Sequence, residues 1–234
     1  MSRARQTASP PAFAPVLALS LILALLPAAC GPLLPGQGPP PDLYRLTPKS
    51  TFDSDLPPVD WQLVLAPPEA ESAIDTTRIA LAPSATRIEY YANASWTDRV
   101  PLMFQTLMLE SFENSDRIVA VGRRALGLRS DYELRVDIRE FQAEYYRHPG
   151  QPPLCAAAPA CVAVAINAKL VHTPQRSIVA TRDFHAFAAS PRNDTADIVE
   201  AFDLALGDIL KDAVSWTLLK GSGDWAARKT GATP

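Results

Sequence analysis

The chain has 234 residues, of which 47% are hydrophobic and 20% are charged, and its net charge is −3. This length and composition are sufficient for one folded domain with its own core, and no second domain is required. Without residues 1–29, discussed next, the balance is 20 basic against 25 acidic residues. A net acidic chain has no electrostatic attraction for DNA or RNA, so nucleic acid is excluded as a partner.

The first 29 residues have the layout of a secretory signal peptide. Arg3 and Arg5 give a basic start without acidic residues, residues 16–26 are largely apolar, and small residues precede Cys30. An apolar helix of that length rises only about 16 Å, against about 30 Å of bilayer hydrocarbon, so it is too short to span a membrane stably. Removal of residues 1–29 is therefore expected.

The residues around Cys30 resemble a lipobox, the motif that lipoprotein signal peptidase cuts after diacylglycerol is attached to the thiol. Pro27 stands where bacterial lipoboxes usually have leucine. We predict lipidation of Cys30, and the resulting two or three acyl chains, such as palmitate, are enough for stable membrane anchoring. Gly31 differs from the aspartate that commonly retains lipoproteins at the inner membrane, so the predicted location is the periplasmic face of the outer membrane. The alternative is an ordinary secretory leader cut near Ala29.

Two further features divide the chain. Residues 30–42 are rich in Pro and Gly without periodicity, which is typical of a stiff tether between a lipid anchor and a folded domain. The folded domain is expected over residues 43–220, and residues 221–234 are expected to be a disordered tail.

The chain then alternates between strand and helix patterns. Short apolar runs bounded by proline predict strands at residues 60–65, 77–81 and 87–92. Over residues 96–112 the apolar side chains recur at helical spacing, which predicts an amphipathic helix of about five turns. The expected capping pair of this helix is Ser95 with Asp98.

The second half of the domain returns to extended patterns. Residues 117–121 have an extended pattern, and residues 132–139 alternate apolar and charged side chains, as in a strand with one face in water. The apolar parity switches after Glu140, which predicts a bulge or strong bend. Residues 162–171 and 178–188 are expected to pair as a hairpin across a polar turn.

Cys155 and Cys161 remain once Cys30 carries lipid. An even pair this close in an oxidising compartment predicts a local disulfide that stabilises its short loop by about 2 kcal/mol. Neither a CxxC spacing nor a nearby pair of histidines is present, so redox and zinc motifs fail on spacing. Free thiols remain the alternative.

The last element is expected to be an amphipathic helix over residues 195–218, capped by Asn193 or Asp194. The order strands, helix, strands, helix predicts a single α+β domain, with a mostly antiparallel sheet and two amphipathic helices packed on one face.

Several local strings resemble the ABC-type transport auxiliary lipoprotein family. They include Leu-Tyr-Arg-Leu-Thr-Pro at 43–48, Ile-Glu-Tyr-Tyr-Ala-Asn-Ala-Ser-Trp at 88–96, Phe-Gln-Ala-Glu-Tyr at 141–145 and Ile-Val-Glu-Ala-Phe at 198–202. The resemblance implies a non-enzymatic accessory lipoprotein of an MCE-type lipid transport system. In such a system an inner-membrane permease and ATPase work with an MCE-domain protein that bridges the periplasm. It further implies docking of that bridge at the outer membrane, and a homo-oligomer.

Five residues near the first helix are candidates for partner binding: Asp75, Arg78, Tyr90, Tyr91 and Trp96. Aromatic side chains are favoured at protein interfaces, and the polar residues can hold a partner's backbone. The alternatives are a core position for Trp96 and one tyrosine, and a simple turn leading into a strand for Asp75 and Arg78.

The sequence offers no catalytic, metal or cofactor site. The three histidines His148, His172 and His185 are scattered, and no Gly-rich phosphate loop, HExxH or GxSxG string occurs. The competing functions are therefore an outer-membrane assembly lipoprotein, serving barrel proteins or the lipopolysaccharide machinery, and, with least support, a periplasmic hydrolase.

Overall fold

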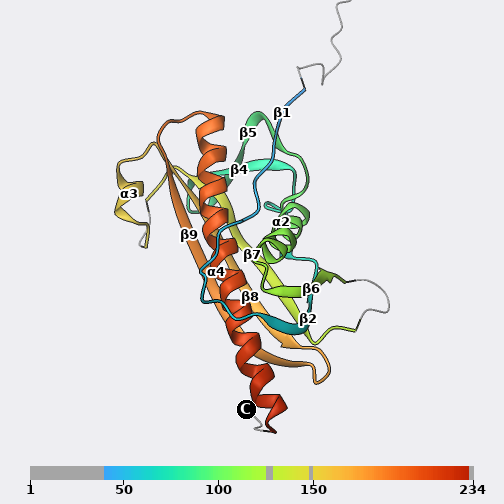
Figure 1. Ribbon diagram of the computed structural model, residues 1–234. Helices are drawn as coiled ribbons and strands as arrows, with labels where there is room; N and C mark the ends of the chain where they lie inside the picture. The colour runs from blue at the N-terminus through green and yellow to red at the C-terminus, as the bar shows by residue number, and fades with distance from the viewer. Residues whose placement is uncertain (1–39, 125–128, 148–149, 232–234) are drawn as a thin grey trace, which may run out of the picture. The chain divides into compact units, whose positions relative to one another are not determined.

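The computed structural model describes residues 40–124, 129–147 and 150–231. The predicted signal peptide, Cys30 and most of the predicted tether lie outside these residues. Within them a single nine-stranded sheet carries two long helices on one face (Figure 1). The elements are β1 Asp42–Tyr44, β2 Val59–Leu65, β3 Glu69–Ala70, β4 Arg78–Ser84, β5 Arg87–Trp96, α2 Val100–Asn114, β6 Ile118–Arg123, β7 Tyr132–Glu144, α3 Pro153–Ala156, β8 Ala160–His172, β9 Ser177–Ser190 and α4 Thr195–Lys229.

The long strand β7 organises the sheet. Along one edge it pairs with β8 over its whole length, and β8 pairs in turn with β9, so these three strands form a continuous antiparallel ladder. Along its other edge β7 pairs with β2, then β3, then β4, each through a few parallel residues. The predicted α+β class is confirmed, and the antiparallel ladders hold most of the paired residues.

The bulge predicted after the alternating part of β7 is present. Ile138 pairs with Ile166 and Glu140 with Ala165, so Arg139 is the extra residue. The extra residue shifts the side-chain parity by one, and the apolar Phe141 therefore faces the helices as Ile138 does.

The helices α2 and α4 cover what we call the inner face of the sheet; the opposite face is the outer face. Phe202 of α4 is fully buried and joins the two layers. Its ring stacks on Phe141 of β7 at 5.1 Å between centroids and meets Trp96 of β5 edge-on at 5.2 Å. Aromatic pairs at these separations add to the free energy of burial, so this cluster is the centre of the core.

The predicted disulfide is present between Cys155 in α3 and Cys161 in β8, whose Cα atoms are 5.3 Å apart. Both cysteines are buried. The link fastens α3 to the end of the sheet where β8 begins.

The first helix starts later than the spacing predicts. α2 begins at Val100, and Trp96 is the last residue of β5, where its backbone N–H donates to the carbonyl oxygen of Thr77 at 2.7 Å. The predicted capping pair is wrong, because the N-cap residue is Arg99 and no side chain caps the helix. Trp96 fitted the helical period because a strand and a helix that pack on the same core both direct apolar residues toward it.

The last helix continues beyond its predicted end. α4 begins with Asp194 as its N-cap, as expected, and the Asp194 carboxylate accepts a hydrogen bond from the Asp197 N–H at 3.1 Å. It runs to Lys229, so residues 221–229, expected to be disordered, are helical; residues 232–234 of the expected tail lie outside the described residues. Trp225 packs edge-on against Tyr132 of β7 at 6.3 Å, and contacts of this kind anchor the added turns.

Gly221 explains why a glycine lies inside this helix. A Cβ atom at position 221 would lie 2.5 Å from the Trp61 ring of β2, whereas a Cβ at Gly223 would meet nothing within 4 Å. The helix can therefore approach Trp61 only where it lacks a side chain.

We expect Gly221→Ala to lower the free energy of unfolding by about 1–3 kcal/mol, because either the helix or the buried indole must shift. The matched control Gly223→Ala should leave stability unchanged or raise it by up to about 1 kcal/mol, because alanine favours a helix interior. Urea unfolding of the two variants measures both values, and equal stability of the two would contradict the close contact at Trp61.

Candidate functional site

Two of the predicted partner residues, exposed Arg78 and half-buried Tyr90, form a pair at the surface. The Arg78 guanidinium of β4 lies over the Tyr90 ring of β5, 3.8 Å from its centroid, and the Tyr90 hydroxyl donates to the Ala73 carbonyl oxygen at 3.1 Å. Ile88, two residues before Tyr90 on the same strand, is 42% exposed. We call Arg78, Ile88 and Tyr90 the β4–β5 surface. It offers one cation, one aromatic ring and one aliphatic side chain to a partner.

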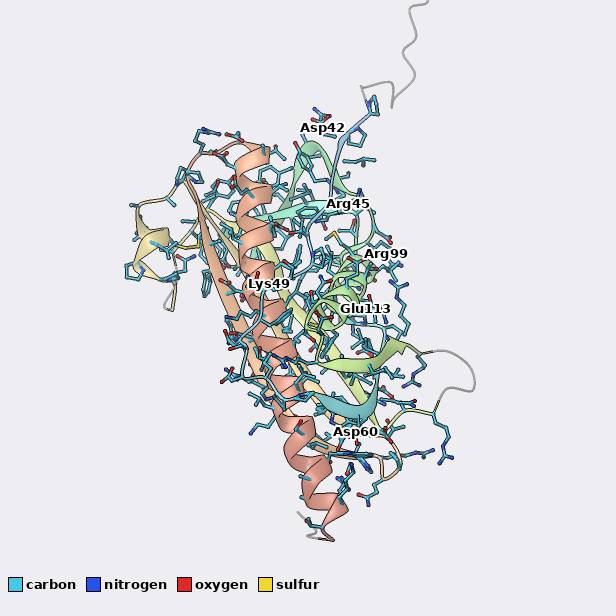
Figure 2. All side chains as sticks on the ribbon, viewed as in Figure 1. Asp42, Arg45, Lys49, Asp60, Arg99 and Glu113 are labelled. Carbon is cyan, nitrogen blue, oxygen red and sulfur yellow. A yellow bond between two sulfur atoms is a disulfide. The ribbon has the colours of Figure 1, made fainter. Side chains whose placement is uncertain are left out.

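Asp75 has an internal partner. Its carboxylate accepts two hydrogen bonds from the Arg99 guanidinium, one of them from Nε at 2.8 Å. This fork ties the turn before β4 to the start of α2, a geometry that fixes orientation as well as charge. Figure 2 shows Arg99 at the same end of the sheet as Asp42 and Arg45, with Asp60 at the other end. Asp75 thus supports the base of the β4–β5 surface.

Tyr91 and Trp96 face inward. The Tyr91 hydroxyl oxygen lies 2.6 Å from that of Tyr145, which donates to Asn193 Oδ1 at 2.5 Å. Burial, and then the hydrogen bond to Tyr145, raise the pKa of Tyr91 far above its usual value. Trp96 is only 1% exposed, so its side chain offers no surface to a partner. The predicted partner-binding role of Trp96 is therefore wrong. The core alternative accounts for it.

Sequence reasoning missed a groove on the outer face of the sheet, at the end where the β8–β9 hairpin turns. It has a volume of about 760 Å³, and we call it the outer-face groove. A neighbouring hollow of about 530 Å³ shares its lining at Arg124, Glu133, Arg135 and Lys169. The groove is lined by Val64, Arg124, Ser130, Glu133, Arg135, Lys169, Val171, Thr173, Arg176 and Ile178.

Glu133 organises one wall of this groove. Alternation predicts a water-exposed side chain there, yet Glu133 is only 7% exposed. Its carboxylate accepts hydrogen bonds from Arg124 at 2.5 Å and from Arg135 at 2.8 Å. The hydrogen bonds from the two arginines lower the free-energy cost of burying the Glu133 carboxylate. In turn, the carboxylate holds both guanidinium groups at the groove.

Arg176 lies at the tip of the hairpin with a φ of 53°. This left-handed conformation disfavours residues with a Cβ by about 1–2 kcal/mol and suits glycine or asparagine. Arginine at this position places a cation at the mouth of the groove. No sequence motif marks these cations. They come from the residue after β6, from β7, from β8 and from the hairpin turn, and each resembles an ordinary solvated charge.

The far end of α4 carries a third polar cluster. The Asp224 carboxylate accepts hydrogen bonds from the Tyr132 hydroxyl at 2.7 Å and from Arg228 Nε at 2.6 Å. Burial alone would raise the pKa of Asp224, but these two donors lower it below its usual value. The His172 ring packs edge-on against Tyr132, and among the described residues its buried Nδ1 has no hydrogen-bond partner. Burial, followed by the charge of Arg228, lowers the pKa of His172.

This cluster predicts a pH dependence of folding. A lowered histidine pKa means that the unfolded chain takes up a proton first, so stability should fall as pH drops below the ordinary His value of 6.5. A second loss should follow below 3.8, where Asp224 begins to bind protons in the unfolded chain. Urea unfolding across this pH range measures both. His172→Phe should remove the first loss and keep the second, and an unchanged profile in that variant would contradict the assignment.

Across residues 40–124, 129–147 and 150–231, no group of three or more His, Cys, Asp or Glu side chains is placed to hold a metal ion. Within those ranges no helix combines the length and the apolar character needed to cross a bilayer.

An open sheet with two helices on one face and a charged groove on the other defines a class of small α+β domain with binding surfaces. A family model described as the ABC-type transport auxiliary lipoprotein component matches residues 44–214. The crystal structure of a Xanthomonas campestris protein of the DUF330 family is 33% identical, covers 79% of this chain and 99% of its own, and has a TM-score of 0.71. A crystal structure of an uncharacterized protein, 12% identical over 75% of this chain and 97% of its own, shares the fold with a TM-score of 0.56.

An uncharacterized protein of Bradyrhizobium diazoefficiens is 27% identical over 157 residues, which are 67% of this chain and 39% of that protein. The chain therefore spans well under half the length of that relative. Because the family match covers most of the folded domain, the chain belongs to the ABC-type transport auxiliary lipoprotein family. This is a family of envelope-associated lipoproteins that assist ABC transport systems, rather than a family of enzymes.

Proposed function

We propose that the protein is a non-enzymatic accessory lipoprotein of an MCE-type ABC lipid transport system, anchored by Cys30 on the periplasmic face of the outer membrane. It docks or stabilises the MCE-domain protein that bridges the periplasm. The observation that carries this proposal is the family match over residues 44–214, which follows directly after a predicted lipobox and tether. Arranged in this order, a lipid anchor and a spacer hold a binding domain close to one membrane.

The β4–β5 surface is the part of the domain that we assign to the bridge protein. β5 pairs with β1, the first described strand after the predicted tether, so this surface lies beside the point where the chain comes from its anchor. Its half-buried Tyr90 and exposed Arg78 are residue types enriched at the centres of protein interfaces. Several copies of the chain around one bridge would present several such surfaces, in line with the implied homo-oligomer.

Affinity purification from detergent-extracted membranes tests the proposal, using the full-length chain with its lipobox intact. We expect an MCE-domain protein or its permease to co-purify. The proposal is wrong if neither protein co-purifies and a deletion strain has changed levels of outer-membrane barrels or lipopolysaccharide. That result would favour the assembly-lipoprotein alternative.

A further inference from the structure

The outer-face groove carries an excess of positive charge that the protein itself does not neutralise. Four of its lining residues are cationic and one, Glu133, is a carboxylate. Glu133 is already hydrogen-bonded to Arg124 and Arg135. Among the described residues, the side chains of Lys169 and Arg176 make no hydrogen bond or ion pair. Two cations therefore remain for an anionic ligand, in a chain that is acidic as a whole.

Hydroxyl groups accompany these cations. Ser130 and Thr173 line the groove with their hydroxyl oxygens 3.3 Å apart. Arginine, lysine and hydroxyl side chains are the donors that bind phosphate oxygens in proteins. The polar part of the groove thus has the chemistry of a phosphate site.

An apolar strip lies beside the cations. Val64 is buried and Val171 half-buried, whereas Ile178 is 60% exposed at the groove. A free phosphate ion would gain no favourable contact from these apolar side chains. The groove volume of about 760 Å³ lies within the range of small-ligand pockets, which is about 300–1,000 Å³.

We propose that the outer-face groove binds the headgroup of a phospholipid. Lys169 and Arg176 contact the phosphate oxygens, and Ile178 contacts the first methylene groups of the acyl chains. The assignment rests on the proposed function, because a lipid-transport accessory that touches its cargo needs such a site. It uses none of the residues of the β4–β5 surface.

The groove also has a definite place in the domain. It lies at the Tyr132 end of β7, next to the β8–β9 turn that contains Arg176. The strand β4, followed in the sheet by β5 and β1, joins β7 at the opposite end, near Glu144. β1 and the β8–β9 hairpin lie at opposite ends of the sheet (Figure 1). The lipid headgroup is therefore held at the end of the domain away from the strand that follows the tether.

Calorimetric titration of the mature chain carrying Cys30→Ser tests the proposal without interference from the anchor. The probes are dihexanoyl phosphatidylglycerol below its micelle concentration and, separately, inorganic phosphate. We expect saturable binding of the phospholipid, and a dissociation constant about tenfold or more higher in the double variant Lys169→Gln with Arg176→Gly. Glycine suits the left-handed φ at position 176, so this change should not unfold the hairpin.

A matched control removes the same charge elsewhere. Arg87→Gln with Lys220→Gln affects two exposed side chains outside the groove and should leave the phospholipid affinity unchanged. Ile178→Ser should weaken phospholipid binding about threefold or more and leave phosphate binding unaltered. Absence of saturable phospholipid binding, or equal binding by the groove variant and the control, would overturn the proposal.

Two further outcomes would also overturn it. Inorganic phosphate that binds as tightly as the phospholipid, with no effect of Ile178→Ser, would define a free-phosphate site. The groove would be a protein-docking site if the groove variant no longer co-purifies the bridge protein and the calorimetric titration detects no phospholipid binding. Phospholipid binding that disappears as expected, while no MCE or permease component co-purifies, supports the groove assignment and refutes only the docking function.

Discussion

Replacing Trp96 by alanine is expected to lower the free energy of unfolding by about 3–5 kcal/mol, the largest loss that we expect from one substitution in the folded domain. The indole is 1% exposed and meets Phe202 of α4 and Phe141 of β7 edge-on at 5.2 and 6.0 Å. Truncation leaves a cavity at the place where α4 packs on the sheet, and neighbouring rings cannot close it. Urea unfolding followed by circular dichroism gives the change in midpoint.

Tyr90→Ala is the control for this experiment. Tyr90 is half-buried on the β4–β5 surface, and an exposed cation–π contact with Arg78 contributes only about 0.5–1 kcal/mol. The two variants should therefore separate stability from partner binding, with Trp96→Ala losing stability and Tyr90→Ala losing the partner. A Trp96→Ala protein as stable as the parent would mean that the indole does not lie in the core.

Replacing Cys30 by serine, with residues 1–29 exchanged for a secretory leader that is cut without lipidation, is expected to move essentially all of the protein from the membrane to the soluble periplasmic fraction. Serine cannot form the thioether that carries the diacylglycerol, and without acyl chains the chain loses the anchoring that two or more of them provide. Fractionation and immunoblotting measure the shift, and a lipid-transport phenotype should appear with it.

The folded domain should be unaffected by this change, because Cys30 precedes the first described residue by ten positions. The thermal midpoint of the Cys30→Ser protein is therefore expected to equal that of the parent. Full transport by the released protein would show that membrane anchoring is incidental to the function.

The elements that could be predicted are those whose pattern is local. Alternation along β7 and the parity switch after Glu140 identify a long bulged strand, because the pleat exposes every second side chain. The order of elements then indicates the α+β class. The disulfide followed from a short spacing in an oxidising compartment, and the N-cap of α4 from an aspartate at the helix start.

The errors arise where the decisive contact is distant in sequence. Glycines at 221 and 223 in an otherwise polar segment suggest a helix end, but Gly221 packs against Trp61, 160 positions earlier in the chain. Trp96 matched the period of the helix that follows it, although its backbone pairs as a strand.

The outer-face groove was out of reach for a related reason. Its cations, one of which directly follows β6, meet only once β6, β7, β8 and the hairpin are folded together. One local signal in the sequence could have indicated the groove: Val171 and Ile178 are apolar at positions where the outer face is otherwise polar.

The measurement that tests the central claim most directly is site-specific photo-crosslinking in living cells, with the crosslinking amino acid at position 78 or 90 of the lipidated, full-length protein. These positions are on the β4–β5 surface, and position 220, exposed on α4, is the control. We predict a crosslinked product that contains an MCE-domain protein from positions 78 and 90, and none from position 220. A product that contains a barrel-assembly or lipopolysaccharide-export protein in its place would contradict a role in lipid transport.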